Sequence, residues 1–189
     1  KGMTFISLRN LDNHLKRIDG TELKENLGGN ATTATSFALA TAAANLNGQQ
    51  LFQYLAEQYY QKDENRPEKF KLPTPFFNIL NGGKHAGGNL KLQEFMISPS
   101  EDLPFPEQLR IAAEVYHKLG SILVQEKGVS AKNLGDEGGY APPLETPEEA
   151  ISFIERAITE AGYVVGKDIR IGLDAAASEF YDPKTKLYE

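Results

Sequence analysis

The sequence DIRIGLDAAASEF (residues 168–180) begins with the two-residue alternation of a β-strand. One face of this predicted strand is apolar (Ile169, Ile171 and Leu173), and the other face ends in Asp174. In an α/β barrel one face of each strand meets the surrounding helices, and active-site residues lie at the C-terminal ends of the strands. Asp174 is the last residue of the strand, and we therefore consider it a candidate site residue.

Two predicted helices precede this strand. Residues 105–127 form an apolar helical pattern, and Thr146-Pro147-Glu148-Glu149 is a capping box with proline at the first helical position. The second helix should run from there to Gly162. On the first helix the side expected to be buried carries Leu109, Ala112, Ala113, Tyr116, Leu119 and Leu123.

Two glycine-rich segments carry the other candidate residues. The segment NILNGGKHAGGNLKLQEFMISP (residues 78–99) surrounds His85 with four glycines and then continues as an alternating segment that contains Glu94. Strands are predicted at residues 75–80 and 92–99. The segment NLGDEGGYAPP (residues 133–143) flanks Glu137 with glycines, and this composition indicates that the loop needs a particular backbone shape.

The first third of the chain is helical by its pattern. Helices are expected over residues 1–20 and 50–61, and between them the small residues from an N-cap at Asn30 to the stop signal Asn47-Gly48 predict a tightly packed, buried helix. Charged residues and prolines follow at 62–75 and suggest a domain boundary. We therefore expect domains at residues 1–70 and 71–189.

Composition excludes several classes of site and partner. Apolar residues make up 40% of the 189 residues, enough for a core, and the net charge of −6 argues against general nucleic-acid binding. The absence of cysteine excludes disulfides, thiolate metal sites and cysteine nucleophiles. A metal would need carboxylate oxygens, which suit magnesium, calcium or manganese. No apolar run is long enough to span a membrane and no signal peptide is visible, so a cytoplasmic location is expected.

Each feature also has an ordinary structural explanation. A glycine-rich loop with a histidine can be a flexible connection, and an aspartate at a strand end can be a helix cap or a salt-bridge partner. Taken together, a histidine on a loop, two glutamates on separate elements and Asp174 at a strand end suit one task. They could hold an anionic substrate with a divalent cation and move a proton or hydroxide.

Five segments in order make the chain similar to the enolase family, the phosphopyruvate hydratases of glycolysis. They are DGTELKENLGGNATTATSFALA (19–40), LPTPFFNILNGGKHAGGNLKLQEFMI (72–97), RIAAEVYH (110–117), NLGDEGGYAP (133–142) and IGLDAAASEF (171–180). The resemblance implies an α/β fold, in which the C-terminal part of a helical α+β N-terminal domain (1–70) is followed by the first half of an enolase-type α/β barrel (71–189). It also implies magnesium-dependent, reversible dehydration of 2-phosphoglycerate to phosphoenolpyruvate, by a full-length enzyme that is a homo-oligomer.

The resemblance also implies residue roles. His85 lies on a mobile loop that closes over the substrate, and Gln93 and Glu94 contact the substrate at its hydroxyl end. Glu137 is the acid that assists hydroxide departure, with Glu94 beside it as the second catalytic carboxylate. Asp174 is the first of three carboxylate ligands to Mg²⁺.

The family pattern continues beyond residue 189, where it has the proton-abstracting lysine and the two other metal ligands. Residues 71–189 are too few to close a barrel, which needs roughly 250 residues. We therefore expect this chain alone to be inactive. Two alternatives stay open at this point: a non-catalytic binding or scaffold fragment derived from an enolase, and another magnesium-dependent dehydratase that acts on sugar acids.

Overall fold

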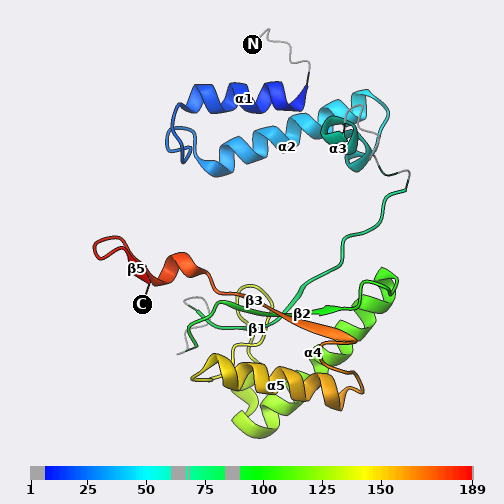
Figure 1. Ribbon diagram of the computed structural model, residues 1–189, viewed down its shortest axis with the longest axis vertical. Helices are drawn as coiled ribbons and strands as arrows, with labels where there is room; N and C mark the ends of the chain where they lie inside the picture. Colours follow the sequence, from blue (N-terminus) through cyan, green and yellow to red (C-terminus); the bar gives the residue numbers. More distant parts are fainter. Residues whose placement is uncertain (1–6, 61–66, 68, 84–89, 189) are drawn as a thin grey trace. The chain divides into compact units, whose positions relative to one another are not determined.

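The computed structural model describes residues 7–60, 67, 69–83 and 90–188, and the chain forms two compact units, Lys1–Phe70 and Lys71–Glu189. The first unit is helical (Figure 1), with α1 at Leu8–Asp19, α2 at Gly29–Leu46 and α3 at Leu51–Tyr60. The three predicted helices are therefore confirmed over their described residues, and Asn47 is the C-cap of α2 as expected.

The turn between α1 and α2 is held by one buried carboxylate. Asp19 is 1% exposed and accepts hydrogen bonds from the backbone N–H groups of Thr21, Asn26 and Leu27. The Thr21 hydroxyl also donates to Asp19, and this bond is the main reason that the pKa of Asp19 lies below its ordinary value. These bonds fix the chain up to Gly28, whose φ of 84° precedes the helix.

Two expectations for α2 are wrong. Asn30 is not the N-cap, because the turn held by Asp19 lets the helix begin already at Gly29, with Gly28 as the cap residue. The helix is also not buried all round. Only Ala40 and Ala44 are buried among its residues, and Phe37 and Leu46 are 69% and 88% exposed, because α1 and α3 cover only part of its surface.

The second unit is built on a three-stranded sheet in the order β1-β2-β3. The strands span Phe77–Asn81, Glu94–Pro99 and Ile169–Asp174, and both pairings are antiparallel. The alternation predicted for residues 169–174 is confirmed by the register, which aligns Ile171 with Ile97 and Asp174 with Glu94. Beyond β3 lie a short 3₁₀ turn and a two-stranded hairpin, β4 (Tyr181–Asp182) with β5 (Leu187–Tyr188).

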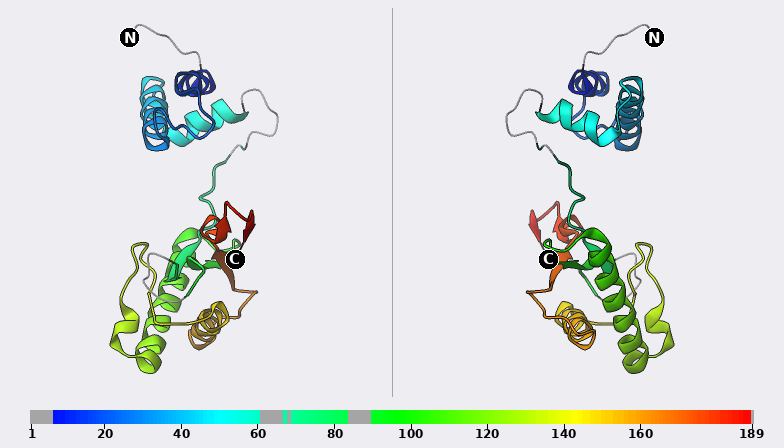
Figure 2. Two further views of the ribbon diagram at one scale, coloured as in Figure 1. Left: turned by 90° about the vertical axis from the view of Figure 1, so that its left-hand side faces the viewer. Right: turned by 90° about the vertical axis from the view of Figure 1, so that its right-hand side faces the viewer.

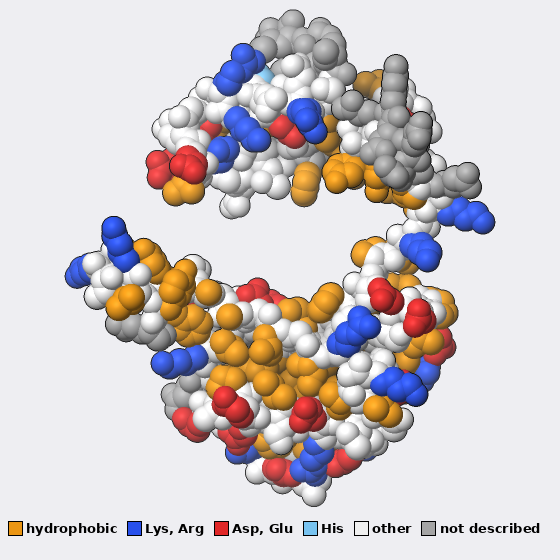
Figure 3. Space-filling view, viewed as in Figure 1, with side chains coloured by type: hydrophobic (Ala, Val, Ile, Leu, Met, Phe, Trp, Pro, Cys, Tyr) orange, Lys and Arg blue, Asp and Glu red, His pale blue; other side chains and the backbone are white. Residues whose placement is uncertain are grey.

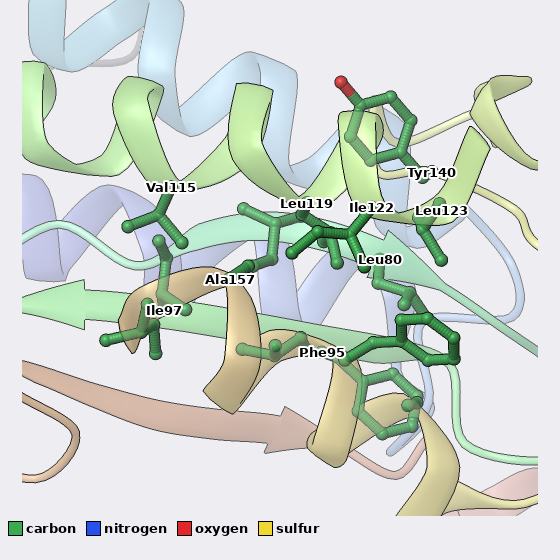
Figure 4. Close-up of a cluster of buried hydrophobic side chains, with 14 of the residues drawn as sticks. Leu80, Phe95, Ile97, Val115, Leu119, Ile122, Leu123, Tyr140 and Ala157 are labelled. Carbon is green, nitrogen blue, oxygen red and sulfur yellow. The ribbon is translucent and has the colours of Figure 1, made fainter. Parts of the chain in front are cut away.

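Two helices pack together on one side of this sheet (Figures 1 and 2). They are α4, which spans Phe105–Lys127 as predicted, and α5, which spans Pro147–Glu160 and ends two residues before the predicted Gly162. The Thr146 hydroxyl accepts from Glu149 N at 3.2 Å, so the predicted N-cap is confirmed. The core between helices and strands includes the residues labelled in Figure 4, such as Phe95, Ile97 and Leu119.

The predicted apolar side of α4 is confirmed in part: Ala112, Leu119 and Leu123 are buried and Tyr116 packs against the core. The rest of the prediction is wrong, because Leu109 is 49% exposed and Ala113 is exposed, whereas Ile111, Val115 and Ile122, which were not predicted, are buried. The helix carries apolar residues around much of its surface, so hydrophobic periodicity alone did not fix which face meets the sheet.

Apolar side chains also remain at the surface of the second unit (Figure 3). Phe76 is 62% exposed, and its ring lies over Gly172, where a Cβ would come within 3.1 Å of it. Gly172 and its register partner Met96 belong to the sheet face that α4 and α5 do not cover. The candidate site residues lie on the same face.

Candidate active site

A row of polar residues crosses the sheet at one end. Asn81 is the last residue of β1, Glu94 is the first residue of β2, and Asp174 is the last residue of β3. The register pairs Asn81 with Glu94 and Glu94 with Asp174. Because β2 runs antiparallel to both neighbours, its N-terminal end lies beside their C-terminal ends, and the three side chains share one sheet face.

An irregularity in β1 brings a second asparagine to this face. The register shifts between Asn78 and Leu80, so that one extra residue separates Asn78 from Asn81. Without this bulge, residues three apart on a strand would point to opposite faces. With it, the side-chain amides of Asn78 and Asn81 both point toward one carboxylate, that of Glu137.

Glu137 comes from the loop between α4 and α5, and backbone hydrogen bonds attach this loop to β1. Asn81 N donates to Tyr140 O at 2.8 Å, and Tyr140 N donates to Ile79 O at 3.0 Å. Within the loop, Gly135 N donates to Gly139 O at 2.8 Å. The loop therefore continues the sheet beyond β1 and places Glu137 beside Asn81, at the end of the row of polar residues.

The Glu137 carboxylate accepts amide hydrogen bonds at both oxygens. Asn81 Nδ2 donates to Oε2 at 2.7 Å, and Gln93 Nε2 donates to Oε1 at 2.9 Å. Asn78 Nδ2 lies at 3.5 Å from Oε2, the limit of a hydrogen bond. Although Glu137 is exposed, its carboxylate thus has a defined orientation.

The glycines of this loop have specific structural reasons. Gly138 has a φ of 84°, which glycine adopts without strain. A Cβ at Gly139 would lie 2.5 Å from Asn81 Oδ1 and 2.9 Å from Leu80 N, so no side chain fits there. The glycines of GDEGG predicted a loop with a particular backbone shape. In the structure this shape brings Glu137 close to β1.

Two stacked tyrosines, Tyr116 of α4 and Tyr140 of the loop, attach the loop to α4. Tyr140 is 2% exposed and stacks on Tyr116 with 4.3 Å between ring centroids and 9° between ring planes. The Tyr116 hydroxyl donates to Gly138 O at 2.9 Å. Burial raises the pKa of Tyr140, so this residue stays a neutral part of the packing.

The electrostatics of the site follow from its three carboxylates. Partial burial raises the pKa of the Glu94 carboxyl, and the nearby Glu137 and Asp174 raise it further. Asp174 is exposed, and its Oδ1 accepts a hydrogen bond from Ala176 N at 2.8 Å. A raised pKa favours the protonated form, so Glu94 is suited to hold a proton at this end of the sheet.

The structure brings together four of the five predicted site residues: Gln93, Glu94, Glu137 and Asp174. His85 lies outside the described residues. The described part of the chain contains no group of three or more acidic or histidine side chains close enough to hold a metal ion. Asp174 can supply one oxygen of the kind that Mg²⁺ prefers, and the described residues do not complete a coordination shell around it.

Sequence reasoning missed the two asparagines. Asn78 lies within the strand predicted at residues 75–80, and Asn81 directly follows it. An asparagine side chain neither titrates nor acts as a nucleophile, so its residue type did not point to a site. The signal for them was a polar residue at each end of an otherwise apolar strand directly before the glycines. Their role became visible only through the bulge that turns both amides toward Glu137.

The described helices include none that is long and apolar enough to cross a membrane.

Comparisons with known protein families agree over both parts of the chain. The family described as "Enolase, C-terminal TIM barrel domain" matches residues 69–189, and "Enolase, N-terminal domain" matches residues 1–55. Among curated proteins, enolase B of Dictyostelium discoideum is 43% identical over 190 residues, covering 100% of this chain and 41% of that protein. An enolase of Methanopyrus kandleri is 44% identical over 188 residues (100% of this chain, 42% of that protein).

A third relative, an enolase of Methanococcoides burtonii, is 45% identical over 181 residues and covers 96% of this chain and 40% of that protein. The chain thus spans about two fifths of the length of the curated relatives it matches.

Proposed function

The chain belongs to the enolase family, and we propose on this premise that a protein carrying this segment is a lyase that interconverts 2-phosphoglycerate and phosphoenolpyruvate in glycolysis. We propose residues 1–70 as the end of its N-terminal domain and residues 71–189 as the first part of its barrel. The observation that carries the proposal is the orientation of Glu137 by two amides, at the end of the row of polar residues that includes Glu94 and Asp174.

Glu137 is assigned the acid that assists departure of the substrate hydroxyl. Its position is defined by Asn81 and Gln93, and positioned acid–base groups contribute about 10²- to 10⁴-fold to rate. Glu94 lies beside it, and its raised pKa suits it to hold a proton that the pair shares. Gln93 and Glu94 are assigned contacts to the hydroxyl end of the substrate, and His85 is assigned a contact made by the glycine-rich loop.

Asp174 is assigned as one ligand of the cation, which we propose is Mg²⁺, with the remaining ligands outside this segment. Bound Mg²⁺ would neutralise the negative charge that develops on the substrate when its carbon-2 proton is lost. We also propose a cytoplasmic homo-oligomer, as the family resemblance implies. The net charge of −6 further argues against general nucleic-acid binding.

The test uses a full-length enolase that carries this segment and compares two measurements. Glu137→Gln keeps the shape and removes the acid, so phosphoenolpyruvate formation should fall by about 10²-fold or more. Exchange of the carbon-2 proton should survive much better, because another residue removes that proton. Equal loss of both activities would mean that Glu137 holds the site or the substrate together instead.

The matched variants separate the other roles. Asp174→Asn should lower exchange and dehydration together, and raised magnesium should restore part of each. His85→Ala should leave magnesium affinity nearly unchanged and impair substrate binding. If the unmodified full-length protein forms no phosphoenolpyruvate, the alternative of a non-catalytic binding or scaffold protein is favoured.

A further inference from the structure

We propose that Asn81 is a positioning residue that sets the orientation of the Glu137 carboxylate. This inference rests on the proposed function only for its kinetic consequence. Asn81 is 2% exposed, and its Nδ2 donates the 2.7 Å hydrogen bond to Glu137 Oε2. A carboxylate accepts hydrogen bonds and donates none when ionised, so the amide nitrogen is the atom that must face it.

The amide of Asn81 is held on its other side by the loop that carries Glu137. Its Oδ1 lies within 2.5 Å of the place a Cβ would take at Gly139, and within 3.0 Å of that place at Gly135. The backbone of Asn81 is fixed as well, since its N–H donates to Tyr140 O at 2.8 Å. The loop backbone at Gly135 and at Gly139 therefore limits rotation of the Asn81 side-chain amide.

The Asn81 amide is not accounted for by folding alone. Its Oδ1 is buried and has no hydrogen-bond partner among the described residues. A buried acceptor without a donor lowers stability, and an apolar side chain of similar size would avoid this loss. The amide nitrogen of the same side chain has two acceptors: Glu137 Oε2 at 2.7 Å and, at the limit of a hydrogen bond, the Gln93 backbone oxygen at 3.5 Å. The short bond to Glu137 is therefore the main interaction that favours an asparagine here.

The kinetic consequence follows from geometry. Glu137 lies on a loop and is exposed. Without the Asn81 donor, the amide donors left to it in the described part of the chain would be Gln93 at 2.9 Å and Asn78 at 3.5 Å, beside the neighbouring Glu94 carboxyl. A displacement of about 1 Å of a reacting group can lower rate by about 10²-fold. Asn81 should therefore matter for hydroxyl departure and much less for removal of the carbon-2 proton.

The experiment compares Asn81→Ala and Asn81→Asp in a full-length enolase that carries this segment. Asn81→Asp keeps the size and replaces the donor with an acceptor, whereas Asn81→Ala removes both size and donor. We expect each to lower phosphoenolpyruvate formation by about 10- to 100-fold, and carbon-2 exchange by less than about threefold. Asn81→Asp should be at least as impaired in dehydration as Asn81→Ala.

The order of the two variants separates positioning from packing. A residue that only packs would make Asn81→Ala the worse variant, and would lower exchange and dehydration equally through loss of folded protein. Either result would overturn the proposal. Asn133→Asp is the matched control, because this exposed asparagine lies in the α4–α5 loop that carries Glu137, and its substitution adds the same charge at a position that is not among the amide donors to Glu137.

A crystal structure of Asn81→Ala decides the proposal independently of activity. We expect the Glu137 carboxylate to leave its position or to occupy several, while the backbone bonds between Tyr140 and β1 remain. If Glu137 keeps the same position without Asn81, the proposal is wrong. This readout applies also to a parent protein that does not dehydrate 2-phosphoglycerate, a result that would reject the proposed function alone.

Discussion

Replacing Gly120 with alanine should destabilise the second unit, although alanine is the better helix former. Gly120 is a buried residue within α4. A Cβ at this position would lie 2.5 Å from Tyr140 Oη and 2.7 Å from Tyr140 Cζ. The ring cannot retreat freely, because it is 2% exposed and stacks on Tyr116. Alanine therefore forces a shift of the helix or of the tyrosine.

Two opposing effects set the magnitude. Glycine in a helix interior is less stable than alanine by about 0.5–1 kcal/mol, so propensity alone predicts a gain. Overpacking a well-filled core lowers stability by about 1–3 kcal/mol. The net effect of Gly120→Ala should be a loss of about 1 kcal/mol, and Gly120→Val, which adds two more methyl groups and a β-branch, should lose at least about 2 kcal/mol.

Urea unfolding of a full-length enolase carrying this segment measures these differences as shifts of the midpoint at constant slope. Ser121→Ala is the control, since it changes the adjacent exposed position of the same helix. Adding Tyr140→Phe to Gly120→Ala should recover part of the loss, because it removes the nearest of the clashing atoms. A Gly120→Ala protein as stable as the parent would refute the reasoning, since helix propensity would then outweigh the contact with Tyr140.

Three further predictions concern stability. The pKa of Asp19 is lowered in the folded state, so its ionised form stabilises the fold at neutral pH. This contribution disappears as the pH falls below about 4 and through the folded-state pKa. The Asp19→Asn variant should therefore have a lower melting temperature than the parent at neutral pH, and the difference should close in acid. Thr146→Ala removes the N-cap of α5 and should lower the free energy of unfolding by about 1 kcal/mol, whereas Thr159→Ala, at an exposed site on the same helix, should change it by less than about 0.5 kcal/mol. A double-mutant cycle with Lys127→Met and Glu149→Gln should give a coupling of about 0.5–1 kcal/mol for the half-buried ion pair at 2.6 Å between α4 and α5, and a coupling near zero would mean that solvent screens it completely.

Local signals predicted the elements of the second unit well. Thr146 and Pro147 fixed the start of α5, and the alternation of residues 169–174 fixed both the limits and the faces of β3. These signals act over a few residues, so a single sequence contains them. The start of α2 was missed because Asp19, more than one helical turn away, holds the preceding turn and moves the helix start to Gly29.

The candidate site depended on longer-range features. Glu94 and Asp174 are 80 positions apart, and their proximity follows from the antiparallel pairing of β2 with β3, which composition does not reveal. The residue types of Glu94, Glu137 and Asp174 pointed to the chemistry, because carboxylates in a site commonly transfer protons or bind cations. The supporting amides carried no comparable chemical signal.

The bulge in β1 explains why the supporting residues are harder to predict than the reacting ones. The residue type of a carboxylate already indicates its possible chemistry. The role of Asn81 depends instead on which face of the sheet its side chain occupies. One extra residue between Asn78 and Leu80 decides that face, and the loop glycines decide whether Glu137 can come close enough to accept the amide. The orientation of the proposed acid thus depends on backbone geometry in two segments more than 50 residues apart, and a substitution at Gly139 should disturb Glu137 through Asn81 as surely as a change in Asn81 itself.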